Sequence, residues 1–328
     1  MVLLEVKGLR VYYYTPRSVV RAVDGVDIYV ERGESLCIVG ESGSGKSTLG
    51  LSIAGLIEPP GRVVDGEVIF DGEVIVSSRF VRTYGYLGKR ITMIFQDPRA
   101  ALNPVMRIGD QIAEALAHSR GMKPGMARER VLELLRSVEI PDPNRVVNSY
   151  PHELSGGMAQ RVVIAIAIST EPDLIIADEP TSALDVTVQA QILRLLKGLV
   201  RENGRSLIFI THDLSVAMEI CDRIAIMYAG KIIEEGSIKA IIEKPLHPYT
   251  IALLGSIPRM GSKRSRLSVI PGEPPDMGSP PSGCRFHPRC ASRFQPCNRS
   301  EPALIQYIDG RRIACFLYGG GGDESPKA

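Results

Sequence analysis

The segment 40–48 constrains the fold of this chain more than any other feature. It reads Gly-Glu-Ser-Gly-Ser-Gly-Lys-Ser-Thr and matches the pattern G-x-x-x-x-G-K-S in full. The apolar run 36–39 before it is typical of a strand, and the apolar-rich stretch 49–56 after it is typical of a helix. In such a loop the glycines let successive backbone N–H groups point at phosphate oxygens, and the helix N-terminus adds a positive dipole end. The sequence therefore predicts a phosphate-binding loop rather than an ordinary Gly/Ser-rich turn.

Two carboxylates follow a second apolar strand. The run 174–177 leads directly into Asp178 and Glu179, and sites gather at the carboxyl ends of parallel strands. With Lys46 reaching the β- and γ-phosphates and Ser47 holding Mg2+, Asp178 suits a second Mg2+ ligand. Glu179 suits the base or orienting group for an attacking water. The alternative is a pair of helix-capping carboxylates at a strand end, which the nearby phosphate loop makes the weaker interpretation.

A second anion-binding pattern lies at 154–161, which reads Leu-Ser-Gly-Gly-Met-Ala-Gln-Arg. Ser155, Gly156 and Gly157 open the apolar run 162–168, so a hydroxyl and free N–H groups converge at a helix N-terminus. A chain with one triphosphate loop has no evident use for a second such site. The economical explanation is that these residues contact a nucleotide held by another subunit.

The remaining patterns predict an α/β fold. Residues 1–40 alternate in short apolar and polar runs, and 97–168 are mainly helical, with Val131, Leu134, Leu135 and Val138 on one face. Strands at 174–177 and 207–210 alternate with helices, which favours β-α-β crossovers and a parallel sheet. Dense Pro and Gly from about 256 onward indicate a boundary, so we expect a domain at 1–255 and a loop-rich module at 256–328, with 319–328 disordered.

Composition excludes several classes of protein. The chain is 44% apolar and 23% charged, which is ordinary for a globular protein and not for a disordered or fibrous one. Its longest unbroken apolar run, 162–168, is far shorter than the roughly 20 residues of a membrane-spanning helix. The N-terminus lacks the pattern of a signal segment. We therefore expect a chain that works in the cytosol.

Taken together, these motifs resemble the ATP-binding cassette (ABC) ATPases, which are P-loop NTPases with a mixed sheet core, an antiparallel β subdomain and an α-helical subdomain. The resemblance rests on motifs that stand in the family's order: the loop 40–48, Gln96, the signature 154–158, the strand 174–179, the turn 182–185 and His212.

The resemblance implies further roles. Tyr13 would stack on adenine, Gln96 would join Mg2+ and couple to a membrane partner, Asp185 would communicate across a dimer, and His212 would contact the γ-phosphate. The residues that would contact ATP or Mg2+ are then Tyr13, Gly40, Ser42, Gly43, Gly45, Lys46, Ser47, Thr48, Gln96, Ser155, Gly156, Gly157, Asp178, Glu179, Asp185 and His212.

Two of these assignments have structural alternatives. His212 could be a capping or core histidine, although its place between Thr211 and Asp213 after a strand favours function. Tyr12, Tyr13 and Tyr14 are consecutive, and alternation with the preceding apolar residues favours Tyr13. A tyrosine that faces inward could equally be a packing residue.

Local features narrow the branch to the oligopeptide/dipeptide importer ATPases, which the segments 96–104, 150–153, 247–250 and 283–290 resemble. The resemblance implies two membrane permeases, a second and related ATPase (a heterodimer, with a homodimer as the alternative), an extracytoplasmic solute-binding protein and a place at the cytoplasmic face of the membrane. Relatives also serve oligosaccharide and nickel importers, so the cargo stays open. A soluble cassette ATPase acting on DNA or ribosomes is disfavoured, because a second cassette and a long heptad insert are both missing.

The tail carries most of the chain's charge imbalance. The net charge is +2, but residues 256–315 hold ten Lys and Arg against four Asp and Glu. Nearby arginines could offset the charge of a metal cluster or form a solvated basic face. Nucleic-acid binding is disfavoured because no nucleic-acid-reading motif accompanies them. The arginines concerned are Arg285, Arg289, Arg293, Arg299, Arg311 and Arg312.

Four cysteines in the tail, Cys284, Cys290, Cys297 and Cys315, could hold zinc or an iron–sulfur cluster, or form disulfides or free thiols. Their spacing is too wide for a usual zinc ribbon and does not match a ferredoxin run. Resemblance to the oligopeptide/dipeptide group implies a 4Fe-4S cluster, and a redox-sensing ATPase is the corresponding alternative function. Cys37 and Cys221 are expected to be isolated core residues.

Overall fold

The computed structural model describes residues 1–122, 124–182, 184–256 and 270–319, which form two compact units. The first unit contains 1–31, 35–82 and the chain from 210 onward, and the second contains 32–34 and 83–209. The predicted disorder at 319–328 lies, apart from Gly319, outside the described residues. The predicted domain boundary at 255/256 also stays a prediction, because 257–269 are not described.

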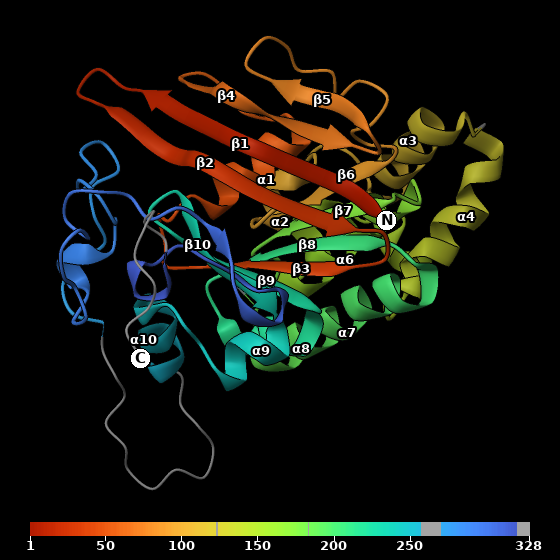
Figure 1. Cartoon of the computed structure of the whole chain (residues 1–328). Coiled ribbons are helices and arrows are strands. Elements are labelled where there is room, and N and C mark those ends of the chain that lie inside the picture. Colours follow the sequence, from red (N-terminus) through yellow and green to blue (C-terminus); the bar gives the residue numbers. More distant parts are fainter. Residues whose placement is uncertain (123, 183, 257–269, 320–328) are drawn as a thin grey trace, which may run out of the picture. The chain divides into compact units, whose positions relative to one another are not determined.

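The first unit begins with an antiparallel sheet of order β2-β1-β4-β5 (Figure 1). Apolar residues of β1 alternate with polar ones, and its buried face carries Leu4, Val6, Leu9 and Val11. The sheet corresponds to the predicted antiparallel β subdomain. Its strands are β1 (Val2–Tyr14), β2 (Val19–Glu31), β4 (Gly61–Phe70) and β5 (Glu73–Ser77).

The first unit also contains strands in the order β11-β12-β10-β9-β3, in which β3 and β9 are parallel and the others antiparallel. Every residue of β3 is buried, as its continuous apolar sequence predicts. The strands are β3 (Ser35–Val39), β9 (Arg223–Tyr228), β10 (Lys231–Ser237), β11 (Ile305–Gln306) and β12 (Arg312–Ile313). The helices are α1 (Lys46–Ala54), α8 (Leu214–Ile220), α9 (Ile238–Glu243) and α10 (Pro248–Gly255), with 3-10 turns at His287–Arg289, Ile308–Gly310 and Phe316–Tyr318.

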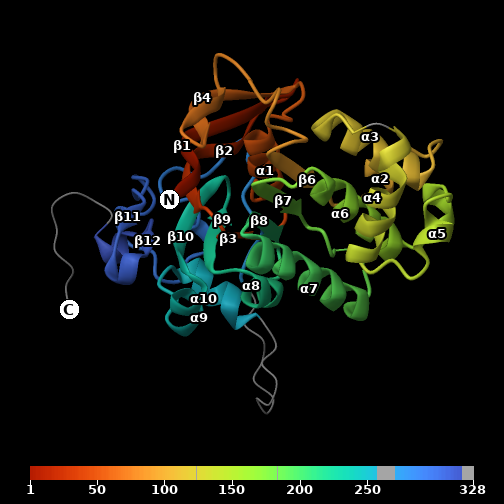
Figure 2. The same cartoon turned by 90° about the vertical axis from the view of Figure 1, so that its right-hand side faces the viewer.

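The second unit combines strands in the order β8-β7-β6 with a group of helices. Figure 2 shows α3, α4, α5 and α6 gathered together. Val131, Leu134, Leu135 and Val138 are buried there, which confirms the predicted apolar face. The elements are β6 (Ile91–Ile94), α2 (Pro98–Ala101), α3 (Ile108–Arg120), α4 (Pro124–Ser137), α5 (Pro143–Val146), a 3-10 turn (Pro151–Glu153), α6 (Gly156–Ser169), β7 (Leu174–Asp178), α7 (Val186–Asn203) and β8 (Ser206–Thr211).

No helix in the described ranges combines the length and the apolar character needed to cross a membrane.

Cys37 and Cys221 correct one prediction. They are buried, as expected of core residues, but they are bonded to each other in a disulfide with their Cα atoms 5.8 Å apart. The sequence gives no sign of this pairing, because 184 positions separate the two residues. The fold joins them by packing α8, which ends just before Cys221, against β3.

Candidate nucleotide site

The segment 40–48 forms the predicted loop between β3 and α1. Lys46 is almost fully buried, and its Nζ donates to the carbonyl oxygens of Gly40 at 2.9 Å and Glu41 at 3.0 Å. Gly45 caps α1 with a φ of 101°, a backbone conformation that favours glycine. The loop thus curls around the lysine, which is the shape that presents backbone N–H groups to an anion.

Strands of the same unit hold this loop closely. A Cβ on Gly40 would lie 2.1 Å from the Met227 carbonyl oxygen, and one on Gly45 would lie 2.0 Å from that of Ala22. The N–H of Gly230, at the tip of the β9–β10 hairpin, donates to the Ser44 carbonyl at 2.8 Å. Glycine at positions 40 and 45 therefore lets the neighbouring strands approach the loop backbone closely, and it also leaves the loop N–H groups open to a phosphate. The other predicted loop residues, Ser42, Gly43, Ser47 and Thr48, lie in the same loop or in the first turn of α1.

The second unit brings the glutamine and the carboxylate strand together. Gln96 follows β6, and its Nε2 lies 3.5 Å from the Ser182 Oγ, which in turn donates to the Glu179 carbonyl at 3.1 Å. Asp178 ends β7 and is 7% exposed. Glu179 has a φ of 44°, which is uncommon for a residue with a side chain of this size and is often found at functional sites.

The signature segment opens α6 in the same unit. Ser155 is its N-cap, and the Ser155 Oγ accepts from the Met158 N–H at 3.3 Å. A Cβ on Gly157 would lie 2.7 Å from the Val188 side chain, so the start of α6 packs against the start of α7. Asp185 caps α7 and accepts from the backbone of Val188 at 3.0 Å. The second unit therefore holds the signature, Asp185, Gln96 and Glu179 on neighbouring segments.

The consecutive tyrosines have different surroundings. Tyr12 donates from its hydroxyl to Asp24 at 2.7 Å, and the Tyr14 ring lies under the Arg62 guanidinium at 3.9 Å. Tyr13 lies over Gly61, where a Cβ would come within 2.6 Å of its ring. These contacts do not test which tyrosine stacks on adenine, and the assignment of Tyr13 stays a prediction.

His212 belongs to the first unit with the loop and is exposed after β8. The next residue, Asp213, occupies the N-cap position of α8. The described contacts do not test a catalytic role for His212. Asp213 accepts from the Ser215 N–H at 2.8 Å at the start of α8. The N-cap of α8 is therefore Asp213, and the role of His212 stays a prediction.

The tail cysteines of the first unit lie near enough to one another for the charge of one to affect the pKa of another. Burial raises the pKa of Cys284 to about 11 and of Cys315 to about 12, and the charges of the neighbouring tail cysteines add to both effects. Backbone N–H groups oppose the shift by bonding to these sulfurs, from Phe286 and His287 to Cys284 and from Leu317 to Cys315. Among the described residues no group of three or more His, Cys, Asp or Glu gathers closely enough for a single metal ion.

The solvated-face alternative is wrong for Arg285, Arg289 and Arg311, whose side chains are at most 7% exposed. Arg285 pairs with the buried Asp24, Arg289 with Glu41 and Arg312 with Glu235. Arg311 is 1% exposed and donates to the Lys244 and Ala240 carbonyls. Carboxylates of the first unit therefore pair with several of the arginines that make the tail basic.

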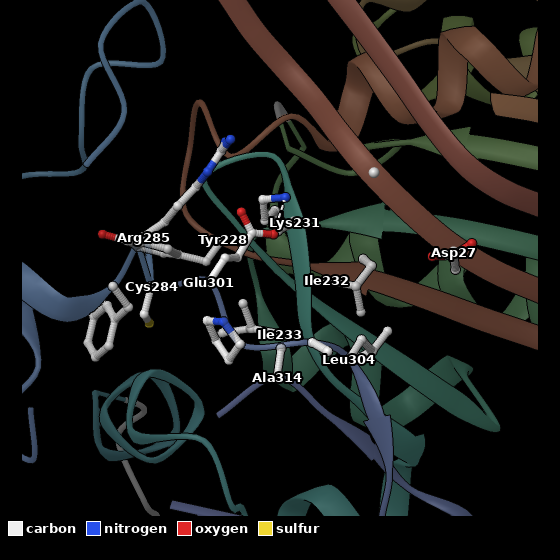
Figure 3. Close-up of a pocket in the computed structure, with 14 residues that line it drawn as sticks. Asp27, Tyr228, Lys231, Ile232, Ile233, Cys284, Arg285, Glu301, Leu304 and Ala314 are labelled. Carbon is white, nitrogen blue, oxygen red and sulfur yellow. Dashed lines mark ion pairs between the residues drawn. The ribbon is translucent and has the colours of Figure 1, made fainter. Parts of the chain in front are cut away.

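Asp24 shows how tightly these charges are held. Burial disfavours its charged form, but the Tyr12 hydroxyl and the cations Lys231, Arg285 and Arg10 lower its pKa overall. Lys231 also pairs with Glu301 at 2.5 Å, and both residues line a cavity of about 300 Å3. Figure 3 shows Arg285, Cys284 and Tyr228 at the same cavity. The tail therefore packs into the unit through several buried or half-buried ion pairs.

Sequence reasoning missed the residues that follow the cassette motifs. His247 is buried, which lowers its pKa to about 3, so its neutral imidazole accepts from the Tyr249 N–H through Nδ1 at 3.0 Å. The Tyr249 hydroxyl in turn accepts from the N–H of Glu41 in the phosphate loop at 3.0 Å. The segment 247–250 and the arginine at 289 were visible only as family features, because their partners lie far away along the chain.

Comparison with known proteins matches two family models to this chain. Residues 23–182 match the family "ABC transporter", and residues 233–297 match "Oligopeptide/dipeptide transporter, C-terminal region". The first match includes the loop, the signature and the carboxylate strand, and the second includes three of the four tail cysteines. The two matches together therefore include much of the cassette and part of the tail, and they leave out residues 1–22, 183–232 and 298–328.

Individual proteins are similar over nearly the whole chain. The oligopeptide transport ATP-binding protein AppD of Bacillus subtilis is 44% identical over 96% of this chain and 97% of its own length. The dipeptide transport ATP-binding protein DppD of the same organism is 47% identical, with 96% and 94% covered. Among solved structures, a dimeric ADP- and Pi-bound form of the ATP-binding cassette MJ0796 aligns with a TM-score of 0.63 and 30% identity, covering 72% of this chain and 99% of that one.

Proposed function

The chain belongs to the ATP-binding subunits of the oligopeptide/dipeptide ABC transporters, and on this premise we propose that it hydrolyses ATP to power the import of peptides. The observation that carries the proposal is similarity over 96% of this chain to peptide-transport ATP-binding proteins, with the phosphate loop formed around Lys46. ATP binding would close two cassettes on each other and drive the permeases, and hydrolysis would reset them.

The chemistry assigned to individual residues is part of this proposal. Lys46 and the N–H groups of the loop would bind the phosphates, Tyr13 would stack on adenine, and His212 would contact the γ-phosphate. Ser47, Asp178 and Gln96 offer hydroxyl, carboxylate and amide oxygens, which is a donor set that suits Mg2+. The cation would neutralise the charge that develops on the phosphates.

Glu179 would orient the attacking water. Its positive φ supports this role, because strain of this kind persists where the surroundings over-determine a side-chain direction. Ser155, Gly156 and Gly157 would contact ATP bound by the opposite cassette, and Asp185 would report the state of that site. The packing of the signature against the start of α7 supports such coupling.

The assembly around the chain is likewise proposed from its relatives. We infer that it works at the cytoplasmic face of a membrane beneath two permease subunits, paired with a second ABC ATPase and supplied by an extracytoplasmic binding protein. The similarity to a dimeric cassette supports the pairing, and a paralogous partner is the arrangement we favour over a homodimer.

Uptake by the reconstituted complex tests the substrate class. Vesicles that hold this chain with its permeases and its partner ATPase should accumulate a labelled peptide only when ATP is supplied on the side of this chain. The matched arm replaces the peptide with a labelled oligosaccharide, which should not enter. Accumulation of the oligosaccharide and exclusion of the peptide would overturn the peptide assignment while leaving the ATPase assignment standing.

We also propose that Cys284, Cys290, Cys297 and Cys315 hold a 4Fe-4S cluster. Mutual proximity of the thiols and N–H groups directed at their sulfurs support this, since hydrogen bonds to sulfur are typical of such clusters. A zinc ion needs its donors about 2.3 Å from one point, and the described residues do not gather in this way. A cubane would bind each of the four thiolates through a separate iron atom. The cluster would cross-link the segment 284–297 to Cys315.

Metal analysis decides this proposal. The protein purified without oxygen should contain about four iron and four sulfide per chain, and Cys284→Ser should lose most of both. Cys221→Ser is the matched control, because it removes a cysteine from the same unit outside the tail group and should keep the iron. One equivalent of zinc without sulfide, or equal iron loss in both variants, would contradict the cluster.

A further inference from the structure

Glu41, the second residue of the phosphate loop, is held by residues that lie beyond the cassette motifs. Its N–H donates to the Tyr249 Oη at 3.0 Å. Its carboxylate accepts from Arg289 in a bidentate pair, with the Nη1 at 2.7 Å from Oε2 and the Nη2 at 3.1 Å from Oε1. Arg289 comes from the tail, directly before Cys290. A tail residue therefore contacts the nucleotide loop directly.

A second connection runs through the β9–β10 hairpin. Arg285, directly after Cys284, donates to the Ala229 carbonyl at the hairpin tip and pairs with Asp24. The next residue, Gly230, donates to the Ser44 carbonyl inside the loop at 2.8 Å. The loop is thus connected to two arginines of the segment between Cys284 and Cys290, directly to Arg289 and through the hairpin to Arg285.

An aromatic contact fixes the same segment between its two arginines. Phe286 is 3% exposed and packs edge-on against Tyr228 and Tyr249, with ring centroids 5.2 and 5.4 Å apart. Figure 3 shows Tyr228 next to Cys284 and Arg285. Such edge-to-face contacts favour one arrangement of the rings. The segment 285–289 therefore has little freedom to shift away from the loop.

The pair between Arg289 and Glu41 is not an ordinary surface ion pair. The two side chains are only 7% and 22% exposed, and Arg289 also donates to the Pro271 carbonyl at 2.8 Å and to the Tyr228 hydroxyl at 3.3 Å. Bidentate, shielded pairs fix geometry as well as adding energy. Without the arginine, the Glu41 carboxylate would lie unneutralised in a loop that must receive phosphate anions.

We propose that Arg289 is a positioning residue for nucleotide binding, which acts through Glu41 to hold the phosphate loop in its receptive shape and to cancel a negative charge beside it. The proposal deepens the proposed ATPase function and rests on it. Through this contact, the tail segment 284–290, which begins and ends with a cysteine, affects the affinity of the phosphate loop for the triphosphate of ATP.

The test compares Arg289→Gln with Arg312→Gln in the full chain. Arg312 is a tail arginine in a comparable pair with the buried Glu235, and none of its described contacts involves the loop. We expect Arg289→Gln to raise KM for ATP about five- to tenfold with kcat within about twofold, because it removes binding rather than transition-state contacts. Arg312→Gln should leave KM unchanged while altering thermal stability to a similar degree.

Two further variants separate positioning from general damage. Arg289→Lys keeps a positive charge and should raise KM for ATP less than Arg289→Gln does. The double variant Glu41→Gln, Arg289→Gln should have a KM no higher than that of Arg289→Gln alone. Should Arg289→Gln fail to fold, Arg289→Lys gives the reading instead, because it keeps a charge next to Glu41 but loses the bidentate pair, and KM should then rise by a smaller factor. An unchanged KM in a folded variant, or an equal rise in Arg312→Gln, would overturn the inference. Absence of ATP binding by the unmodified chain would instead overturn the proposed function.

Discussion

Glu179→Gln should reduce ATP turnover by about 100- to 10,000-fold, the range typical for loss of a group that assists proton transfer in a reaction. The amide has nearly the same shape as the carboxylate but cannot take a proton from the attacking water. ATP binding by the loop around Lys46 should persist, so the variant should accumulate as an ATP-bound, associated form. Phosphate release measures turnover, and ATP-dependent association is measured by size-exclusion chromatography with light scattering.

Glu171→Gln is the matched control for this variant. Glu171 belongs to the same unit and also has a positive φ, 52°, but its ion pair with Arg130 lies on the surface. Exposed pairs of this kind contribute little, so turnover should stay near that of the unmodified chain. Hydrolysis at the normal rate in Glu179→Gln would show that another residue assists the water.

Gly45→Ala should abolish nucleotide binding. The new Cβ would lie 2.0 Å from the Ala22 carbonyl oxygen, closer than any nonbonded contact allows, at a residue whose φ is 101°. Either the loop or β2 must move, and either movement would turn the backbone N–H groups of the loop away from the phosphates. Backbone strain alone would lower the free energy of unfolding by about 1–3 kcal/mol.

Gly72→Ala separates strain from collision. Gly72 has a similar φ of 84° in the turn between β4 and β5, and nothing lies within 4 Å of a Cβ built there. The two variants should lose similar stability from backbone strain, but only Gly45→Ala should lose ATP binding in a fluorescent-nucleotide titration. Wild-type affinity in Gly45→Ala would contradict the described packing of the loop.

Local patterns predicted the central elements well. The apolar run 36–39 is β3 (Ser35–Val39), and the runs 174–177 and 207–210 are the cores of β7 and β8. Buried parallel strands are continuous apolar segments, so their sequence alone marks them. Helix α1 begins three residues before the predicted 49, because its N-terminus is set by Gly45 and the loop rather than by apolar periodicity.

Long-range charge pairing could not be predicted in the same way. Arg289 and Glu41 are 248 positions apart, and Arg285 and Asp24 are 261 apart. Periodicity reports which face of an element is apolar, and it carries no information about which distant carboxylate an arginine meets. The one signal in the sequence was the charge distribution: residues 256–315 carry a net positive charge and the rest of the chain a net negative charge, so the tail is attracted to the remainder of the chain.

The most direct measurement of the central claim is ATP hydrolysis by the complete transporter in vesicles, with and without peptide-loaded binding protein outside. If this chain powers peptide import, the loaded binding protein should raise hydrolysis several-fold over the empty one, and Glu179→Gln should remove both the stimulated hydrolysis and the uptake. An equal hydrolysis rate with loaded and with empty binding protein, or peptide uptake that continues in Glu179→Gln, would contradict the account.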